Sequence, residues 1–228
     1  MSLLLNIDTA TNNASVCISK HGETIAIREN DNQKEHAAFL HVGIESLFRE
    51  TSTHISDIDA VAITSGPGSY TGLRVAMAAA KGLCFALNKP LITVNTLKVM
   101  AYSAKEYLNG EKLLQDDALL CPMIDARRME VFTALYNFSL EEILAPCALI
   151  LINTSFERWK SNAIYFFGNG SKKFRNFGRS YSIYIDCSYS ARHLAKIATN
   201  RFLNNRFSNV IYTDPDYLKE FHSQKDKY

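Results

Sequence analysis

The sequence has few cysteines that could form cross-links or metal sites, and it lacks the long apolar runs that anchor a chain in a membrane. Its five cysteines are never closer than 26 residues, so it contains no CxxC pair for a metal or a redox site. Their odd number argues against a disulfide framework. No apolar run approaches the roughly 20 residues that cross a bilayer, and the first eight residues lack the basic flank of a signal peptide. We therefore expect a cytoplasmic chain with free thiols and no membrane association.

Glycine and proline are also scarce, at 10 and 5 of the 228 residues, and 47% of the chain is apolar against 21% charged. This composition argues against disorder and against a repeat array. The length suits one large domain or two small lobes, because hydrophobic cores in this size range begin to divide.

Charge is unevenly distributed, although the formal net charge is only +2. Residues 1–150 carry 12 basic against 17 acidic side chains, whereas residues 151–210 carry 10 basic against two acidic ones. Interleaved with these basic charges are Trp159, Phe174, Phe177, Tyr181 and Tyr189. The combination fits a surface that contacts an RNA backbone and stacks bases. It fits equally a solvated basic face over an aromatic core, and both interpretations stay open.

Apolar spacing in the first half predicts three short strands followed by alternating helices and strands. The strands are expected at 3–8, 14–19, 24–29, 58–64 and 91–94, and the helices end near residues 50, 87 and 107. This order, with the later strands parallel, resembles the ribonuclease-H-like lobe that occurs in pairs in actin-like proteins.

A polar, acidic segment at 109–118 predicts a hinge before a smaller second lobe. There, strands are expected at 119–125, 131–137, 163–167 and 182–185, and a helix at 190–203. The predicted fold class is therefore α/β, an actin-like (ASKHA) fold of two ribonuclease-H-like lobes with mixed sheets. The expected lobes are residues 1–108 and 109–228.

Five segments resemble a known family. They read IDTAT at 7–11, SGPGSYTGLR at 65–74, KGL at 81–83, VNTL at 94–97 and DARRMEVF at 125–132. In that order they are similar to the TsaB family over roughly the first 135 residues. The later PDYLK at 215–219 is similar to the family's C-terminal Pro-x-Tyr-Leu-Arg, so we expect a complete chain with a short second lobe.

The resemblance implies a non-catalytic subunit that is required for threonylcarbamoylation of the adenosine next to the anticodon in tRNA. It implies binding to TsaD, the paralogue that transfers the threonylcarbamoyl group, and to TsaE, an ATPase, with tRNA reached through that complex. No residue of this chain receives a catalytic role, and no activity of the chain alone is expected. No tightly bound cofactor is expected either, and ATP or ADP would lie at the interface with TsaD.

The chain departs from TsaD where that paralogue is expected to hold a metal. TsaD carries a His-x-x-x-His pair on its first helix, whereas His36 and His41 here are five residues apart. Five residues turn a helix so that the two side chains point about 140° apart, which prevents chelation. The second histidine stretch of TsaD is replaced here by Asn95-Thr96-Leu97. We expect no metal site.

Two segments stand where actin-like ATPases place their phosphate loops, namely the first hairpin turn of each lobe. A third, the glycine-rich turn between a strand and a helix, offers an anion the free N–H groups of a helix N-terminus. The candidate phosphate contacts are Asp8, Thr9, Gly66, Gly68, Ser69, Arg127 and Arg128. Each segment also reads as an ordinary turn whose polar groups satisfy its own amides. The first hairpin lacks the glycines that let N–H groups approach phosphate. Independent ATP hydrolysis is therefore not expected.

The second helix is apolar over more of its circumference than one sheet face covers, and together with the first helix it could form half of a four-helix bundle. Small residues on the second helix allow another helix to approach closely. We expect an interface with TsaD, or with a second copy in a homodimer, and burial against the sheet is the alternative. The candidate interface residues are His36, Phe39, Leu40, Gly43, Ile44, Leu47, Leu73, Ala76, Met77, Ala79, Ala80 and Leu83.

Two other classes of function stay open. The chain could be a self-sufficient actin-like kinase or a metalloprotease, against which the missing phosphate glycines and the missing metal histidines count respectively. It could also be a homodimeric scaffold without a tRNA role, which would form a stable dimer indifferent to TsaD.

Overall fold

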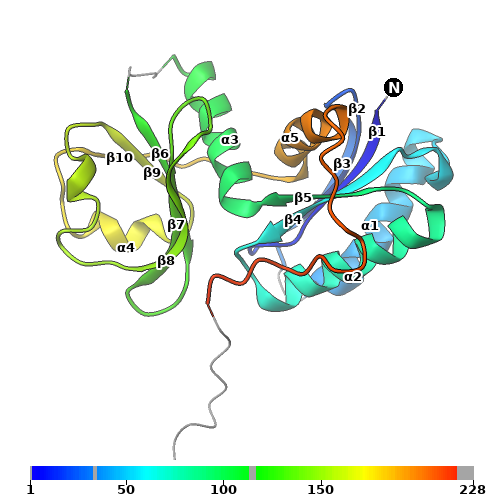
Figure 1. The fold of residues 1–228 in the computed structure, drawn as a ribbon, viewed down its shortest axis with the longest axis horizontal. Helices are drawn as coiled ribbons and strands as arrows, with labels where there is room; N and C mark the ends of the chain where they lie inside the picture. Colours follow the sequence, from blue (N-terminus) through cyan, green and yellow to red (C-terminus); the bar gives the residue numbers. More distant parts are fainter. Residues whose placement is uncertain (1, 33–34, 113–116, 220–228) are drawn as a thin grey trace, which may run out of the picture.

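Two five-stranded mixed sheets, one in each lobe, form the centre of the computed structural model, which describes residues 2–32, 35–112 and 117–219 (Figure 1). In the first lobe a three-stranded antiparallel meander is followed by two strands, each reached through a helix, that run parallel to the first strand. The strand order is β3-β2-β1-β4-β5. The elements are β1 (Leu3–Asp8), β2 (Ala14–Lys20), β3 (Glu23–Asn30), α1 (His36–Thr51), a 3₁₀ turn (Ile55–Asp57), β4 (Ala60–Gly66), α2 (Tyr70–Leu87), β5 (Leu91–Asn95) and α3 (Thr96–Gly110).

The second sheet repeats the topology of the first, with order β10-β9-β6-β7-β8. An antiparallel meander of β6, β7 and β8 is again followed by two strands parallel to its first member. The elements are β6 (Leu119–Asp125), β7 (Glu130–Tyr136), β8 (Glu142–Ile150), a 3₁₀ turn (Glu157–Trp159), β9 (Ile164–Phe167), α4 (Ser171–Arg175), β10 (Ser182–Tyr184) and α5 (Ala191–Leu203). The predicted fold class is confirmed, and every predicted strand lies within two residues of its observed bounds.

The strands at the centre of the first sheet are buried on both faces, which explains why they read as nearly continuous apolar runs. Leu5 and Ile7 of β1 pack with α1 and α2, whereas Leu4 packs with α5 on the opposite face. Side-chain caps start two helices: Ser69 accepts from the N–H of Gly72 in α2, and Asn95 caps α3.

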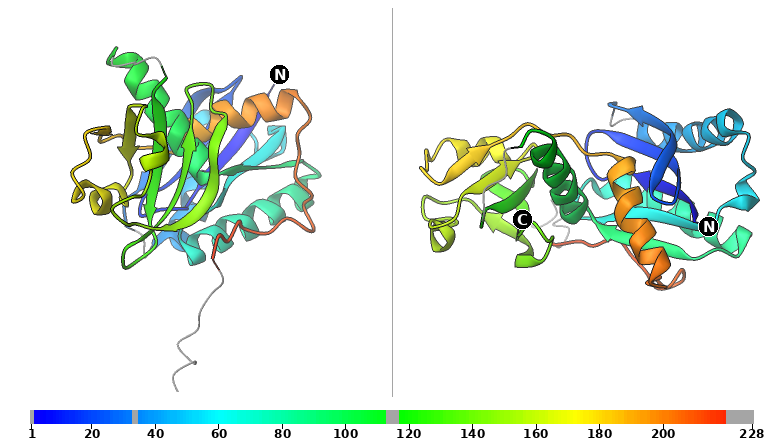
Figure 2. Two further views of the ribbon diagram at one scale, coloured as in Figure 1. Left: turned by 60° about the vertical axis from the view of Figure 1, so that its left-hand side comes forward. Right: turned by 90° about the horizontal axis from the view of Figure 1, so that it is seen from above.

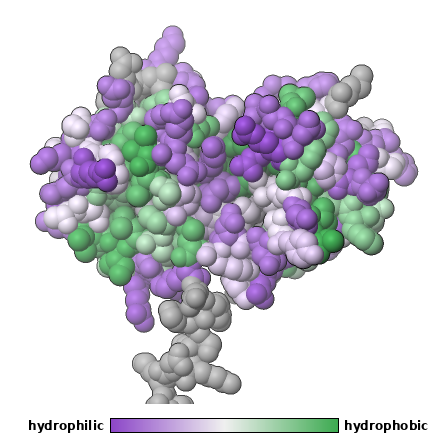
Figure 3. Space-filling model, viewed as in Figure 1, coloured by the Kyte–Doolittle hydropathy of each residue, from purple (hydrophilic) through white to green (hydrophobic). Residues whose placement is uncertain are grey.

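The sequence did not predict β8, which is the edge strand of the second sheet. Its side chains are exposed or half-buried, so they show little apolar alternation, and Pro146 interrupts the run. Proline is tolerated there because an edge strand leaves some N–H groups unpaired. Ile143 and Ile150 of this strand are exposed, and the space-filling view shows apolar surface over this lobe (Figure 3).

Each sheet is covered by a helix that belongs, in sequence, with the other lobe. Apolar side chains of α3, among them Met100 and Ala104, join the core of the second sheet, and Leu194 and Ala198 of α5 join that of the first. The two helices pack against each other between the sheets (Figure 2). The expected second lobe, 109–228, therefore differs from the structure, because an apolar stripe does not say which sheet it covers. The predicted hinge at 109–118 includes residues 113–116, which lie outside the described residues.

The chain after α5 returns along the first lobe, and we call residues 208–219 the C-terminal strap. Ser208 forms a bridge with Leu91 at the edge of the first sheet. Asp216 then binds Ser65 twice, through its N–H to the carbonyl oxygen at 2.7 Å and through its carboxylate to the hydroxyl at 2.6 Å. Lys219 reaches Glu130 of the second lobe at 2.5 Å. The strap thus ties both lobes together.

Two glycines let the first hairpin loop lie directly on the start of α2. A Cβ atom on Gly68 would lie 2.1 Å from the carbonyl oxygen of Ala10, and one on Gly72 would lie 2.2 Å from that of Thr9. The N–H of Ser69 donates to Ala10 at 2.7 Å, and the Thr9 hydroxyl donates to the Gly72 carbonyl at 2.7 Å. These glycines serve close packing between two parts of the chain.

We expect Gly68→Ala to lower the free energy of unfolding by about 1–3 kcal/mol, because the added methyl group overlaps the Ala10 carbonyl. Gly82→Ala in α2 is the matched control. No heavy atom lies within 4 Å of its added Cβ, so it should raise stability by about 0.5–1 kcal/mol. Urea denaturation measures both values. A Gly68→Ala variant as stable as the wild type would contradict the packing described.

Candidate functional site

A cleft of about 1290 Å³ lies between the two lobes. The first lobe contributes the loops at 10–12 and 68–71 together with Arg74, and the second contributes 124–128, Glu130, Phe132 and Asn169. Tyr217 and Lys219 of the C-terminal strap complete the lining. The topology therefore brings together segments that are far apart in the sequence.

The cleft collects only some of the candidate phosphate contacts. Gly68, Ser69, Arg127 and Arg128 line it. Asp8, Thr9 and Gly66 do not line it, contrary to the expectation. The first two are almost wholly buried. Gly66 is covered by the strap, since a Cβ there would lie 2.6 Å from the Asp216 carbonyl oxygen.

Asp8 is instead the centre of a buried polar cluster behind the cleft. Its carboxylate accepts from the Thr64 hydroxyl at 2.6 Å and from the N–H of Ala10 at 3.3 Å, and it interacts with the Tyr189 hydroxyl. Tyr189 also donates to the hydroxyl of Thr11 at 3.2 Å. Burial raises the pKa of Asp8 to about 6, although these hydrogen bonds lower it in part. The group is thus costly to ionise in the folded chain.

Two arginines form the tip of the β6–β7 hairpin that faces the cleft. Arg127 and Arg128 both adopt left-handed backbone conformations, with φ of 69° and 46°, which cost an L-residue about 1–2 kcal/mol each. Asp125 secures the turn by accepting from the N–H of Arg127 at 2.7 Å. Within the described part of the chain, neither guanidinium has an acidic partner.

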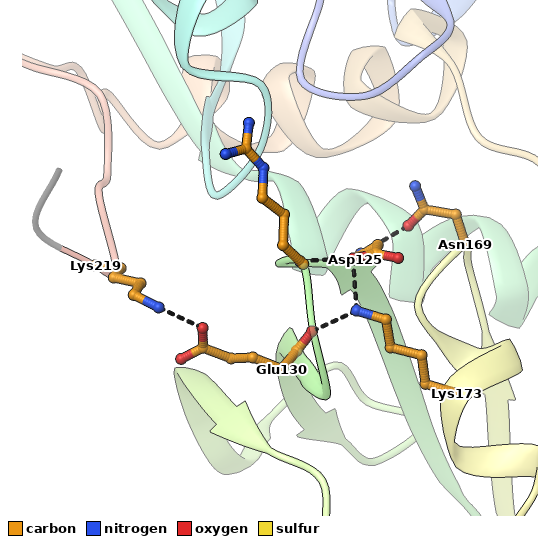
Figure 4. Close-up of polar contacts among 6 residues, drawn as sticks. Asp125, Glu130, Asn169, Lys173 and Lys219 are labelled. Carbon is orange, nitrogen blue, oxygen red and sulfur yellow. Dashed lines mark hydrogen bonds and ion pairs between the residues drawn. The ribbon is translucent and has the colours of Figure 1, made fainter. Parts of the chain in front are cut away.

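The acidic groups of the cleft are neutralised by lysines (Figure 4). Lys173 donates to Asp125 at 2.6 Å and to the carbonyl of Glu130 at 2.9 Å, while Lys219 pairs with the Glu130 carboxylate. Burial alone would raise the pKa of Asp125, but the hydrogen bonds from Lys173 and from the N–H of Arg127, together with the charge of Lys173, outweigh burial and leave the pKa lowered. Asn169 accepts from the N–H of Asp125 at 2.9 Å. Net positive charge therefore remains with the arginines.

Two tyrosines and an arginine stand on the first-lobe side of the cleft. Tyr70 at the start of α2 and Tyr217 of the strap lie 5.2 Å apart between ring centroids. The Arg74 guanidinium lies 4.2 Å from the Tyr70 centroid, and its Nε donates to the Tyr217 hydroxyl at 3.0 Å. Sequence reasoning assigned these residues no role. The sequence did contain a hint of this cluster: each of the two family-like segments SYTGLR and PDYLK places a tyrosine close to a basic residue.

The five aromatic side chains that the sequence interleaves with the basic charges of residues 151–210 pack within the protein. Phe174 is fully buried in the core of the second lobe, and Trp159, Phe177 and Tyr181 pack half-buried against the same core. Tyr189 belongs to the Asp8 cluster. The aromatic-core interpretation is the one that fits. Lys173 is likewise engaged within the lobe.

The candidate partner face on α1 and α2 needs a correction. Nine of its twelve residues are buried in the chain's own first lobe: His36, Leu40, Gly43, Ile44, Leu47, Leu73, Ala76, Met77 and Ala80. The apolar stripe found in the sequence is thus mainly the sheet-facing one. His36 holds a loop of the cleft, because its Nε2 lies 3.0 Å from the carbonyl oxygen of Asn12.

An apolar groove of about 680 Å³ lies beside that buried stripe, between the outer sides of α1 and α2. Phe48 borders it from α1, and Ala78, Ala79, Gly82 and Leu83 border it from α2. Its rim is polar, with His41, Glu45, Arg49 and His54. Phe85 and Val42 on the same helices are 87% and 66% exposed. Of the predicted residues, Ile44, Ala79 and Leu83 line the groove.

The described residues include neither a metal-binding cluster nor a helix fit to cross a membrane. Within 2–32, 35–112 and 117–219, no group of three or more His, Cys, Asp and Glu side chains is arranged to hold a metal ion. None of the helices described for this chain combines the length and apolarity that a bilayer crossing demands.

Known proteins show clear similarity to this chain. A family model described as TsaD, tRNA N6-adenosine threonylcarbamoyltransferase, matches residues 24–224. The tRNA threonylcarbamoyladenosine biosynthesis protein TsaB of Bacillus subtilis (strain 168) is 28% identical over 135 residues, which cover 59% of this chain and 55% of that protein. TsaB of Escherichia coli (strain K12) is 33% identical over 134 residues, covering 59% and 54%. The chain thus spans about half the length of the curated relatives it matches.

A solved structure supports the fold over a longer stretch. A Pseudomonas aeruginosa protein, described as uncharacterized with similarity to peptidase YEAZ, superposes with a TM-score of 0.78 at 24% identity. The superposition covers 96% of this chain and 100% of that chain.

We expect the wild-type chain to lose stability, relative to Asp8→Asn, as pH rises from about 4 to about 6. The folded chain keeps the Asp8 proton up to about pH 6, whereas the unfolded chain releases it near 3.8. The folded state therefore binds more protons in this window, so the stability contribution is complete below pH 3.8 and lost by about pH 6. The difference amounts to about 3 kcal/mol at most. Urea denaturation of both proteins across this range measures it, and a difference independent of pH would contradict it.

Proposed function

The chain belongs to the TsaD family of tRNA N6-adenosine threonylcarbamoyltransferases and to its TsaB group, and on that premise we propose that it serves threonylcarbamoyladenosine synthesis in tRNA as a non-catalytic subunit. In this role it binds and supports a TsaD-like paralogue, which performs the transfer next to the anticodon. A TsaE-like ATPase joins the pair, and any ATP or ADP is held where the chain meets its TsaD-like partner.

The packing of the first hairpin loop supports a non-catalytic role. In an actin-like ATPase this loop would leave backbone N–H groups free for phosphate, but here the N–H of Ala10 is bonded to the Asp8 carboxylate, and the Ala10 carbonyl accepts from the N–H of Ser69 at the start of α2. The space beside Gly68 is filled by the same carbonyl group. Asp8, the acidic residue of this loop, is buried and hydrogen-bonded to Thr64. Phosphate chemistry is therefore left to the partner.

The apolar groove between α1 and α2 is the observation that carries the proposal. Alanine and glycine at 78, 79 and 82 leave the α2 backbone open to a close helix contact. A TsaD-like paralogue matches the same family model, so it would offer a related helix pair, and the two pairs would form a four-helix bundle. Phe48 and the exposed Phe85 supply apolar area at the centre and end of this surface.

A second copy of this chain would fit the same groove, because a paralogous surface and a self-complementary one share the same geometry. Homodimer and heterodimer are then competing states of one surface. The kinase interpretation is disfavoured because the Ala10 carbonyl of the first hairpin loop fills the space beside Gly68. No arrangement of the described residues favours a metalloprotease.

We expect Ala79→Glu to abolish support of threonylcarbamoyl transfer in a reconstituted reaction with tRNA, the TsaD-like and TsaE-like proteins and the adenylate-forming enzyme. The added carboxylate would have to be desolvated in the groove when the TsaD-like protein docks, so affinity for that protein should fall at least about tenfold. Activity and affinity are both measured, the latter by titration calorimetry.

The matched control is Ser161→Glu, which adds the same charge on an exposed loop of the second lobe and should leave both readouts unchanged. Leu40→Glu is unsuitable, because Leu40 is fully buried and the variant would unfold the first lobe. Transfer that proceeds equally well without the chain would refute the subunit role. Equal activity of the two glutamate variants would refute the groove as the interface.

A further inference from the structure

We propose that the cleft between the lobes binds single-stranded RNA, with bases stacked against Tyr70 and Tyr217 and phosphates held by Arg127 and Arg128. The inference depends on the proposed function only for tRNA as the natural source of the strand. Its physical basis is the combination of an aromatic wall and an arginine wall that face one cleft.

The aromatic wall is assembled from two distant parts of the chain. Tyr70 and Tyr217 are 37% and 42% exposed, so each offers part of a ring to the cleft. Arg74 fixes their arrangement, since it lies over the Tyr70 ring and donates to the Tyr217 hydroxyl. The rings are inclined at 34°. Exposed rings beside a guanidinium are the stacking platform that single-stranded nucleic acid uses.

The arginine wall carries charge that the protein itself does not neutralise. Asp125 is paired with Lys173, and Glu130 is paired with Lys219. These pairs leave Arg127 and Arg128, at the tip of the hairpin, without an acidic partner among the residues described. The planar guanidinium fork suits the bidentate binding of phosphate oxygens. The left-handed turn that carries both arginines also keeps them adjacent.

The shape and chemistry of the cleft favour a strand over a free nucleotide. A free nucleoside di- or triphosphate is commonly held in a cradle of backbone N–H groups, and the candidate cradle at Gly68 and Ser69 is occupied by Ala10. The volume of about 1290 Å³ also exceeds the roughly 300–1000 Å³ of most small-molecule sites. Side-chain cations on one wall and rings on the other, without a backbone cradle, are typical of a groove that follows a strand.

The first test is fluorescence anisotropy of the full chain with a labelled, unstructured RNA of about 12 nucleotides. The variant Arg127→Asn/Arg128→Asn should weaken binding at least about tenfold and reduce the salt slope, log Kd against log salt concentration, by about 1.4, because two phosphate contacts are lost. Asparagine is chosen because it tolerates the left-handed conformation of both positions. Circular dichroism confirms that the variant is folded.

The matched control, Lys160→Asn/Arg206→Asn, removes the same charge from exposed positions outside the cleft. It should change affinity by less than about twofold and leave the slope within about 0.3 of the wild type. Equal effects of the two double variants would overturn the proposal, because binding would then depend on net charge alone.

A second pair of variants separates stacking from the structural role of Tyr217. Tyr217→Phe keeps the ring but loses the hydrogen bond from Arg74, whereas Tyr217→Leu keeps apolar bulk without a ring. Binding should persist in the first and fall about tenfold in the second. Equal losses would overturn the stacking role.

Competition identifies the ligand. ADP at about 1 mM should leave the RNA bound, since a lone nucleotide makes few of the contacts along the strand. Displacement by micromolar ADP would overturn the proposal and identify a free-nucleotide site. These outcomes are separate from the reconstitution test, which depends on the groove between α1 and α2 and on a partner that is absent from this assay.

Discussion

The exchange of α3 and α5 between the lobes is the constraint on which the rest of the structure depends. Helix α3 follows the last strand of the first sheet but packs on the second sheet, and α5 follows the last strand of the second sheet but packs on the first, so each sheet is covered by a helix that comes after the strands of the other. The hydroxyl of Ser103 in α3 donates to the carbonyl of Ser188 just before α5, at 2.5 Å, and adds a polar tie at the crossing. The C-terminal strap adds a third connection through Lys219 and Glu130. Wide opening of the cleft would expose apolar surface at the crossing, which opposes it.

The lobes are held together, and the parts of the fold that would bind phosphate in an actin-like ATPase are used here for internal packing. The first hairpin loop rests on α2 with carbonyl oxygens where a ligand would otherwise approach Gly68 and Gly72. Asp8 faces Thr64 rather than solvent, and burial leaves its ionisation costly. The unneutralised charge of the cleft comes from side chains: Arg74 on one wall, and Arg127 and Arg128 on the other. The cleft is thereby suited to an extended anion more than to a compact one.

The sequence predicted most elements and both sheets, because buried strands and amphipathic helices leave periodic patterns that do not depend on tertiary context. It missed β8, whose half-exposed residues and Pro146 show little alternation. It could not say which sheet α5 covers, since a stripe records burial and not the partner. The same limit explains the partner face: the strongest apolar stripe on α1 and α2 is the one that packs inward, and α2 lines the groove beside it with small residues, Ala78, Ala79 and Gly82, as well as Leu83. Tyr217 and Arg74 meet across 143 positions of sequence, a distance that local patterns cannot bridge.

Helix α2 contributes to both the cleft between the lobes and the apolar groove between α1 and α2. Its first turns carry Tyr70 and Arg74 into the cleft, and its middle carries Ala78, Ala79 and Gly82 along the groove. At 1.5 Å per residue, Arg74 and Ala79 are only about 8 Å apart along the axis. A partner that packs on the groove therefore presses on the same rigid helix that positions the aromatic wall, with Ser69 capping its start. Binding at either surface would then favour the same placement of α2, which is the physical condition for coupling between them.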